Sequence, residues 1–324
     1  MIMAVTGASG FIGSHLTAEL AARGHRVRAI SRRPRPCSES NLITAARADY
    51  EDADALARAL TDVDVVFHAA GATRGPTREA LRAANERLTR RVLGALSRGA
   101  NPPRFVYLSS LAAAGPATSP QSPLNEDDPP TPVEGYGLAK LGAERAVLEA
   151  AHIASTIVRP AAVYGARDRD FLELFRLARR GIALHAANRD HVISIVHVRD
   201  AVDAIIRAAL EPTAVGRVYF VANDEPAQWG QLFRLGASAA GRQLRVDLEL
   251  PSVLVDVGAR IGDFCARVTG NATLLTTEKV ALGKRRYWLC SSARAKRELG
   301  FRAATTLEDG FAETYRWYRE HRWL

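Results

Sequence analysis

The chain opens with Ile2-Met3-Ala4-Val5-Thr6, and the glycine-rich stretch Gly7-Ala8-Ser9-Gly10-Phe11-Ile12-Gly13 follows directly. The first five residues are the apolar run of a buried strand, and a helical pattern begins after Gly10. Glycines at this spacing allow a tight turn and let the backbone approach a phosphate closely. The unpaired N–H groups of the helix bring the positive end of its dipole to the same point. A strand, a glycine turn and a helix in this order predict a dinucleotide-binding unit.

The first half of the chain alternates short apolar runs with helical patterns, as a parallel sheet with crossover helices requires. We expect strands at 2–6, 26–31, 63–69, 105–109 and 155–159, with a short one near 46–48. Helices are expected at 11–22, 54–59, 77–97 and 136–151. The predicted fold class is α/β, a Rossmann-type doubly wound parallel sheet with a smaller C-terminal substrate lobe.

The regular alternation ends near Gly165, and this point sets the predicted domain boundaries. Residues 1–165 are expected to form the dinucleotide-binding Rossmann domain, with residues 193–225 returning to it through a strand at 217–222. The substrate-binding lobe is expected at 166–192 and 226–324. Within and between these parts we expect helices at 170–180 and 200–210, strands at 192–197 and 286–289, and a last helix capped by Thr306. The proline-rich segment 116–135 is either an exposed connector or a rim of the site.

The composition is typical of a globular protein, with 47% hydrophobic and 24% charged residues. No run approaches the roughly 20 apolar residues of a membrane-spanning helix, and the start of the chain lacks a signal-peptide pattern. The three cysteines, at positions 37, 265 and 290, lack the spacing of a metal site or a disulfide framework. We therefore expect a cytoplasmic protein without a metal.

The net charge of +9 comes mainly from arginines spread along predicted helices. No aromatic residues interleave with these arginines and no nucleic-acid-binding motif occurs, so we expect no nucleic-acid partner. The expected partner is a small-molecule substrate. The apolar run 251–268 is expected to pack within the substrate lobe, with peripheral contact to a membrane surface as the alternative.

The cofactor site is predicted from the glycine turn and from the ends of the next strands. The second strand ends in Ser31-Arg32-Arg33 without a carboxylate, and guanidinium groups suit a 2′-phosphate, so NADP is favoured over NAD. Asp49 is placed where a loop reaches the adenine, and the small residues Ala69-Ala70-Gly71 let the cofactor lie along the backbone. The cofactor-binding residues predicted from these segments are Gly7, Ser9, Gly10, Phe11, Ile12, Gly13, Ser31, Arg32, Arg33, Asp49, Ala69, Ala70 and Gly71.

Three residues carry the predicted chemistry. Tyr136 and Lys140 are four apart, so a helix places them on one face, and Ser110 follows a predicted strand. The lysine cation and an oxidised nicotinamide would lower the tyrosine pKa to about 7, which takes roughly 4 kcal/mol of stabilisation. Tyr136 is then a general acid or base, Lys140 holds the nicotinamide ribose, and Ser110 polarises the substrate carbonyl. His68, inside an apolar strand, is expected to be structural.

These segments resemble the short-chain dehydrogenase/reductase superfamily, in its extended branch. The resemblance covers essentially the whole chain and includes Thr6–Gly13, Tyr136–Lys140, Arg159-Pro160-Ala-Ala-Val-Tyr164-Gly165 and Val196-His197-Val-Arg-Asp200. It implies that Ser110, Tyr136 and Lys140 are the catalytic residues.

The resemblance also implies roles outside the catalytic residues. Asn85 is placed on the nicotinamide side, and Pro160 and Val163 face the nicotinamide amide. The family habit implies a homodimer through the helices that carry Asn85 and Tyr136. Small residues on the second of these helices would permit close contact between subunits, or would pack internally; they are Ala139, Gly142, Ala143 and Ala146.

The extended branch contains several reaction types, so the resemblance leaves the substrate open. Residues 159–177 look like the 3β-hydroxysteroid dehydrogenase and dihydroflavonol reductase group, whose substrates are bulky apolar alcohols and ketones. Residues 184–195 depart from the pattern of nucleotide-sugar epimerases and dehydratases. The expected activity is hydride transfer between NAD(P) and a hydrophobic secondary alcohol or ketone that is sterol-like or flavonol-like. A nucleotide-sugar epimerase or dehydratase is the alternative, and a non-catalytic NADP-binding sensor is a third interpretation.

Overall fold

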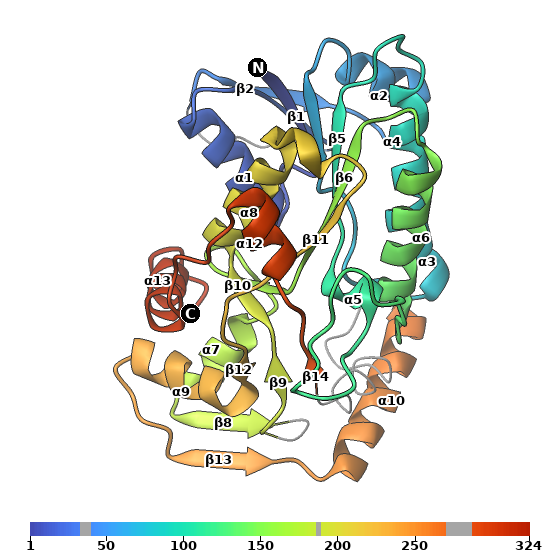
Figure 1. Cartoon of the computed structure of the whole chain (residues 1–324). Coiled ribbons are helices and arrows are strands. Elements are labelled where there is room, and N and C mark those ends of the chain that lie inside the picture. Colours follow the sequence, from blue (N-terminus) through green and yellow to red (C-terminus); the bar gives the residue numbers. More distant parts are fainter. Residues whose placement is uncertain (33–39, 186–188, 270–286) are drawn as a thin grey trace.

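A computed structural model describes residues 1–32, 40–185, 189–269 and 287–324. Its centre is a seven-stranded sheet with the order β11-β6-β5-β4-β1-β2-β3, in which all neighbours run parallel (Figure 1). This is the doubly wound sheet predicted from the sequence. The chain proceeds in opposite directions from β1, so the loops after β1 and β4 diverge and leave a crevice. The strands are β1 (Ile2–Thr6), β2 (Arg26–Ser31), β3 (Ile43–Arg47), β4 (Val65–His68), β5 (Arg104–Leu108), β6 (Ser155–Pro160) and β11 (Val218–Val221).

Helices cover both faces of this sheet (Figure 1). On one face α1 packs against α8, and on the other α4 packs against α2 and α6. Successive strand residues point to opposite faces, so Met3 and Val5 enter one apolar core while Ala4 enters the other. The helices around the sheet are α1 (Phe11–Ala22), α2 (Ala53–Ala59), α3 (Arg78–Arg82), η1 (Ala83–Arg87), α4 (Leu88–Leu96), α5 (Leu111–Ala114), α6 (Gly135–Glu149), α8 (Val198–Leu210), η2 (Pro212–Ala214) and α12 (Ala293–Leu299).

The helix expected at 77–97 is interrupted by a π-helical turn. Thr77 begins α3 by accepting a hydrogen bond of 3.1 Å from the Ala80 N–H. The next five residues form the π-helical segment η1, and α4 continues from Leu88. Residue periodicity does not distinguish such a turn from an α-helix, and π-turns occur frequently at functional sites. The turn carries Asn85, whose side chain is buried.

The strand expected at 217–222 is β11, which pairs with β6 at the edge of the main sheet. The strand expected at 192–197 is divided into two short strands, β9 (Val192–Ile193) and β10 (Ile195–His197), which belong to different sheets. Between them lies Ser194, where the chain changes sheets. Of the strand expected at 286–289, Arg286 lies outside the described residues, and β14 (Tyr287–Trp288) is present.

The remaining elements lie mainly below the seven-stranded sheet in Figure 1. Three small sheets pair β7 (Ala162–Tyr164) with β10, β9 with β12 (Ala227–Gln228) and β14, and β8 (Ile182–His185) with β13 (Val246–Glu249). The helices of this region are α7 (Leu172–Ala178), α9 (Trp229–Ala239), α10 (Ser252–Thr269) and α13 (Leu307–Glu320).

Aromatic side chains form the core of this lower part. The ring of Phe175 lies 5.1 Å from that of Phe311 and 5.3 Å from that of Tyr318. Thr306 caps α13, because its hydroxyl accepts a hydrogen bond of 3.1 Å from the Asp309 N–H. The predicted cap of the last helix is therefore confirmed.

Helix α10 contains most of the apolar run 251–268, which was expected to pack within the lobe. Only part of it does so: Val255 and Ala259 are buried, but the next face of the helix is half or more exposed. The exposed side chains on that face are Val253, Leu254, Val257 and Ile261.

The proline-rich segment 116–135 packs against β14 and the residues that follow it. The Ala117 N–H donates to the Tyr287 carbonyl at 2.8 Å, and the Leu124 N–H donates to the Leu289 carbonyl at 3.0 Å. The segment thus forms part of the site's rim, since its end carries Glu134 into the cavity described below. Among the cysteines, Cys290 is a buried free thiol, and the side chains of Cys37 and Cys265 lie outside the described residues.

Candidate active site

Ser110, Tyr136 and Lys140 come together at the carboxyl end of the sheet. Ser110 follows β5, and the other two stand on the first turns of α6, which packs against α5. The Lys140 ammonium lies 6.0 Å from the centre of the Tyr136 ring, and it donates a hydrogen bond of 2.7 Å to the Leu108 carbonyl. The Ser110 hydroxyl accepts a hydrogen bond of 3.1 Å from the Ala112 N–H, and it also forms a hydrogen bond with the Tyr136 side chain.

Glu134 determines where the catalytic helix begins. One of its carboxylate oxygens accepts from the Tyr136 N–H and the other from the Gly137 N–H, each at 2.8 Å. A Cβ at Gly137 would lie 2.2 Å from the Ala112 carbonyl oxygen, so only glycine lets α6 start this close to α5. Glu134 was missed from the sequence, because the side chains typical of an N-cap are those of serine, threonine, aspartate and asparagine.

Burial controls the protonation of the two ionisable groups. It raises the pKa of Tyr136 above its usual value, and a hydrogen bond with Ser110 only partly opposes this. It lowers the pKa of Lys140 to about 8, while the Glu144 carboxylate acts in the opposite direction. The low tyrosine pKa expected from the sequence is therefore not produced by the chain alone. Tyr136 is held as a neutral phenol, the form that donates a proton.

A cleft of about 510 Å³ lies along the carboxyl ends of β1, β2 and β4. Nine of the predicted cofactor residues line it: Gly7, Ser9, Gly10, Ser31, Arg32, Asp49, Ala69, Ala70 and Gly71. Phe11, Ile12 and Gly13 stand behind this lining in the first turn of α1. Arg33 lies outside the described residues. The cleft therefore runs along the glycine turn to the strand end that carries Arg32.

The glycine turn has the shape that a phosphate site requires. Gly7 has a φ of +69°, and the Gly10 N–H donates to its carbonyl at 2.9 Å. A Cβ at Gly13 would lie 2.2 Å from the same carbonyl oxygen, so the helix approaches the turn as closely as a glycine permits. Gly10 begins α1 without any capping side chain, which leaves the first N–H groups of the helix for an anion.

Several residues of the cleft were missed from the sequence. The Tyr50 hydroxyl accepts from the Gly7 N–H at 3.2 Å and donates to the Ile30 carbonyl at 3.4 Å, so it supports the turn from below. Glu51 also lines the cleft, and its carboxylate pairs with Arg91. Tyr50 and Glu51 directly follow Asp49, a predicted cofactor residue, and this position could have indicated that they line the cleft. The remaining lining residues that were not predicted are Ala72, Ala80, Ala83, Ala84 and Leu88.

Asn85 of the π-helical turn and Lys140 both lie next to Gly71. The Asn85 amide nitrogen donates to the Ala72 and Leu81 carbonyls, each at 2.9 Å. Pro160 ends β6 and Val163 lies in β7, on either side of two alanines that line the second cavity, described below. None of Asn85, Pro160 and Val163 lines the cofactor cleft itself.

His68 has the structural environment expected for it. Its ring nitrogens lie 2.7 Å from the Thr6 hydroxyl and 3.1 Å from the Thr89 hydroxyl. Burial lowers the pKa of His68 to about 3, so its ring is neutral at physiological pH. The side chain joins β1, β4 and α4 below the site.

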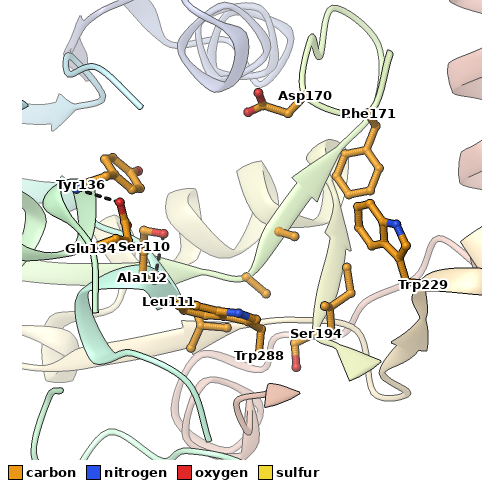
Figure 2. A pocket seen from close by; sticks show the side chains of 13 residues that line it. Ser110, Leu111, Ala112, Glu134, Tyr136, Asp170, Phe171, Ser194, Trp229 and Trp288 are labelled. Atoms are coloured by element: carbon orange, nitrogen blue, oxygen red, sulfur yellow. Dashed lines mark hydrogen bonds between the residues drawn. The ribbon is translucent and has the colours of Figure 1, made fainter. Parts of the chain in front are cut away.

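A second cavity, of about 370 Å³, begins at the catalytic hydroxyl groups (Figure 2). Figure 2 shows Tyr136 and Ser110 on one side of it, and Phe171, Trp229 and Trp288 on the others. Its walls come from the end of β5 and α5, the start of α6, β7, β9, β14, the segment before α7 and the start of α9. The lining residues are Ser110, Leu111, Ala112, Glu134, Tyr136, Ala161, Ala162, Asp170, Phe171, Ile193, Ser194, Trp229 and Trp288.

The charged groups of this cavity are both acidic and both already engaged. Glu134 caps α6. Asp170 forms an ion pair with Arg74, which comes two residues after Ala72 of the cofactor cleft. The described lining residues include no lysine, arginine or histidine. The cavity therefore suits an apolar molecule that brings one carbonyl or hydroxyl group to Ser110 and Tyr136.

Across the described ranges, no helix is long and apolar enough to cross a membrane. In the same ranges, no group of three histidine, cysteine, aspartate or glutamate side chains lies close enough to hold a metal ion.

Comparison with known proteins gives relatives over the whole chain. The ceramide reductase of Caulobacter vibrioides is 29% identical over 100% of this chain and 96% of its own length. The 2-alkyl-3-oxoalkanoate reductase of Stenotrophomonas maltophilia is 31% identical over 83% of each chain. The solved structure of MoeE5 in complex with UDP-glucose and NAD superposes with a TM-score of 0.80 at 26% identity, over 99% of this chain and 100% of that one.

The family assignment agrees with this site. Residues 3–222, which include the glycine turn, the catalytic residues and β11, match the profile of the NAD dependent epimerase/dehydratase family. The glycine turn at the cleft and the Ser-Tyr-Lys group beside it are the residues that the sequence predicted for a nicotinamide-dependent reaction. The chain belongs to the NAD-dependent epimerase/dehydratase family, within the extended branch of the short-chain dehydrogenase/reductases.

Proposed function

We propose that this NAD(P)-dependent oxidoreductase interconverts a hydrophobic ketone and its secondary alcohol. One observation carries the proposal: the catalytic hydroxyl groups open into an apolar cavity walled by Phe171, Trp229 and Trp288. A flat, apolar substrate of sterol-like or flavonol-like shape fits such aromatic walls. The names of two relatives, ceramide reductase and 2-alkyl-3-oxoalkanoate reductase, also support an apolar substrate.

The chain's own residues divide the work of ketone reduction. A bound reduced nicotinamide supplies the hydride to the carbonyl carbon. Tyr136, neutral in its half-buried position, donates its phenolic proton to the carbonyl oxygen, and the Ser110 hydrogen orients that oxygen. Lys140 uses one of its three hydrogens on the Leu108 carbonyl, which leaves the others for the nicotinamide ribose and the tyrosinate that forms. Oxidation of the alcohol follows the same path in reverse.

The cofactor cleft supports NADP as the preferred cofactor. Arg32 stands at the end of β2 and lines the cleft, where a guanidinium suits a 2′-phosphate. Arg32→Ala should weaken NADPH binding about tenfold or more and leave NADH binding nearly unchanged, since a hydrogen bond to a charged group contributes roughly 1.5–3 kcal/mol. Arg26→Ala, at the other end of the same strand, is the matched control. Equal loss of both cofactors in Arg32→Ala would contradict the preference.

A nucleotide-sugar substrate is the competing candidate, because MoeE5 was solved with UDP-glucose and has this fold. Such a substrate brings a diphosphate, whose charges need cationic partners. The described lining of this cavity offers no cationic side chain, and its two charged groups are the carboxylates of Glu134 and Asp170. The apolar ketone is therefore the better fit.

The test follows absorbance of the reduced nicotinamide while the protein is mixed with apolar ketones, including 3-ketosteroids, or with UDP-sugars. Oxidation of NADPH with an apolar ketone is expected. Tyr136→Phe should lose at least ~10²-fold in turnover, the lower range for acid–base catalysis. Tyr315→Phe, a tyrosine of α13 that packs on Phe175, is the matched control. Cofactor-neutral conversion of a UDP-sugar, or a fully active Tyr136→Phe variant, would refute the proposal.

The cytoplasmic location and the homodimer also remain proposals. The small residues of α6 do not support a dimer, because Ala139, Ala143 and Ala146 are buried within the chain. Leu138 and Leu148 on the same helix are 46% and 53% exposed, and an apolar contact between two copies would cover them. Sedimentation analysis tests the dimer, and a monomer mass at micromolar concentration would exclude it.

A further inference from the structure

A buried ion pair lies beneath the catalytic residues. Glu144 of α6 and Arg159 of β6 are 2% and 5% exposed. The Arg159 Nε donates to Glu144 Oε1 at 2.8 Å, and its Nη2 donates to Oε2 at 2.6 Å. The Ser109 hydroxyl donates a further hydrogen bond to Oε1. The carboxylate thus receives three hydrogen bonds from the protein, the condition under which a buried charge is tolerated.

These hydrogen bonds connect the strands that carry the site. Ser109 directly precedes Ser110 at the end of β5, and Arg159 directly precedes Pro160 at the end of β6. The Arg159 guanidinium also lies 5.4 Å over the Phe220 ring of β11. A movement of Glu144 would therefore reach three neighbouring strands at their functional ends.

The same carboxylate stands on the catalytic face of α6. Tyr136, Lys140 and Glu144 follow one another at intervals of four residues, so they share one side of the helix. The Glu134 cap holds the start of this face, and the pair with Arg159 holds it two turns later. Between the two attachments the helix can neither rotate nor slide without breaking buried hydrogen bonds.

Glu144 also contributes to the charge around Lys140. Burial neutralises two of the neighbouring groups, because it lowers the pKa of His68 to about 3 and raises that of Tyr107 well above its usual value. Among the described groups, the one that favours the charged form of Lys140 is the Glu144 carboxylate. The titratable and charged groups that face Lys140, directly or through Glu144, are Tyr136, Glu144, His68 of β4, Tyr107 of β5 and Arg159 of β6.

We propose that Glu144 and Arg159 are positioning residues for the reaction. Their ion pair locks the catalytic face of α6 against β5 and β6, and the Glu144 carboxylate supplies the negative charge that keeps Lys140 protonated. Neither side chain touches substrate or cofactor, so both act through Lys140 and Tyr136. The inference rests on the proposed roles of those two residues.

The charge of Lys140 is directly measurable, because the chain contains four lysines, at positions 140, 279, 284 and 296. NMR of the cofactor-free protein with ¹³C-labelled lysine Cε follows each titration, and Lys140→Arg identifies the signal. Glu144→Gln should lower the Lys140 pKa by about one unit or more, as loss of a nearby opposite charge does. Glu149→Gln, on the same helix but paired with Arg90 at the surface, should leave it unchanged.

Turnover of the same variants with NADPH and an apolar ketone separates the possible failures. Turnover of Glu144→Gln should fall about tenfold or more, because misplaced catalytic groups react more slowly. The alkaline limb of its pH–rate profile should move to lower pH together with the Lys140 titration. Unchanged titration and pH profile, together with an inactive Tyr136→Phe, would overturn the positioning pair but leave the proposed function standing. An active Tyr136→Phe would overturn the proposed function, and the pair with it.

A second variant covers failure of Glu144→Gln to fold. Glu144→Met combined with Arg159→Met leaves no unpaired buried charge, and such apolar replacements are often tolerated. The Lys140 pKa should still fall, because the Glu144 carboxylate favours the charged form of Lys140 and the double variant removes it. A wild-type titration in this double variant would overturn the proposal.

Discussion

Replacing Gly13 by alanine tests whether the glycine turn is shaped for a phosphate. The new Cβ would lie 2.2 Å from the Gly7 carbonyl oxygen and 2.9 Å from its carbon, both backbone atoms. Such contacts do not fall below 3.0 Å in proteins, so α1 must move away from the turn. The required displacement is about 1 Å, which is enough to misplace binding groups and cost about 10²-fold in their function.

We therefore expect the Kd for NADPH to rise about 10²-fold, equivalent to about 2.7 kcal/mol. The free energy of unfolding should fall by about 1–3 kcal/mol, as overpacking usually costs. Isothermal titration calorimetry measures the first quantity, and urea unfolding followed by circular dichroism measures the second.

Gly94→Ala is the matched control, because Gly94 lies within α4 and a Cβ there meets no atom within 4 Å. It should leave the Kd unchanged and stabilise the fold by about 0.5–1 kcal/mol through helix propensity. A folded Gly13→Ala variant with wild-type affinity for NADPH would refute the reasoning, since the close approach of helix and turn would then not matter for binding.

Two further predictions concern the buried histidine and the apolar cavity. Burial lowers the pKa of His68 to about 3, so below pH 6.5 the unfolded chain binds the extra proton and stability is lost as pH falls toward 3. Between pH 7 and pH 4.5, urea unfolding of His68→Gln should therefore show about 2–3 kcal/mol less loss than the wild type, and equal losses would contradict this. Trp288→Ala should raise KM for an apolar ketone about tenfold or more while the Kd for NADPH stays constant, because it removes a wall of the substrate cavity alone. A similar rise in KM for a small polar ketone would exclude that explanation.

Local patterns predicted the sheet because they depend on near neighbours. The apolar run at 2–6 predicted the buried strand, and the Thr306 side chain predicted the start of the last helix. The glycine turn is equally local, since it needs only a strand before it and a helix after it. The π-helical turn at Ala83–Arg87 escaped prediction, because its residues have the same spacing as those of an ordinary helix.

The protonation of the site could not be read from residue types. From Tyr136 and Lys140 we predicted a tyrosine pKa lowered by the lysine cation together with an oxidised nicotinamide, whereas in the folded chain by itself burial raises that pKa. The burial of a residue depends on packing by several segments that are far apart in the chain, so it cannot be predicted from the residues around it. The pair Glu144 and Arg159 escaped notice for the same reason, since the fold brings the two residues together from α6 and β6.

The sequence by itself determined the Rossmann-type sheet, the glycine turn and the identity of Ser110, Tyr136 and Lys140 as candidate catalytic residues. Turns, helix caps and the alternation of strand residues depend on residues close together in the chain, so the sequence predicts them. Only the tertiary structure decided that Tyr50 supports the turn, that Trp229 and Trp288 wall one cavity, and that no basic group faces the substrate in its described lining. Those facts depend on contacts between residues far apart in sequence, which packing of the whole chain creates.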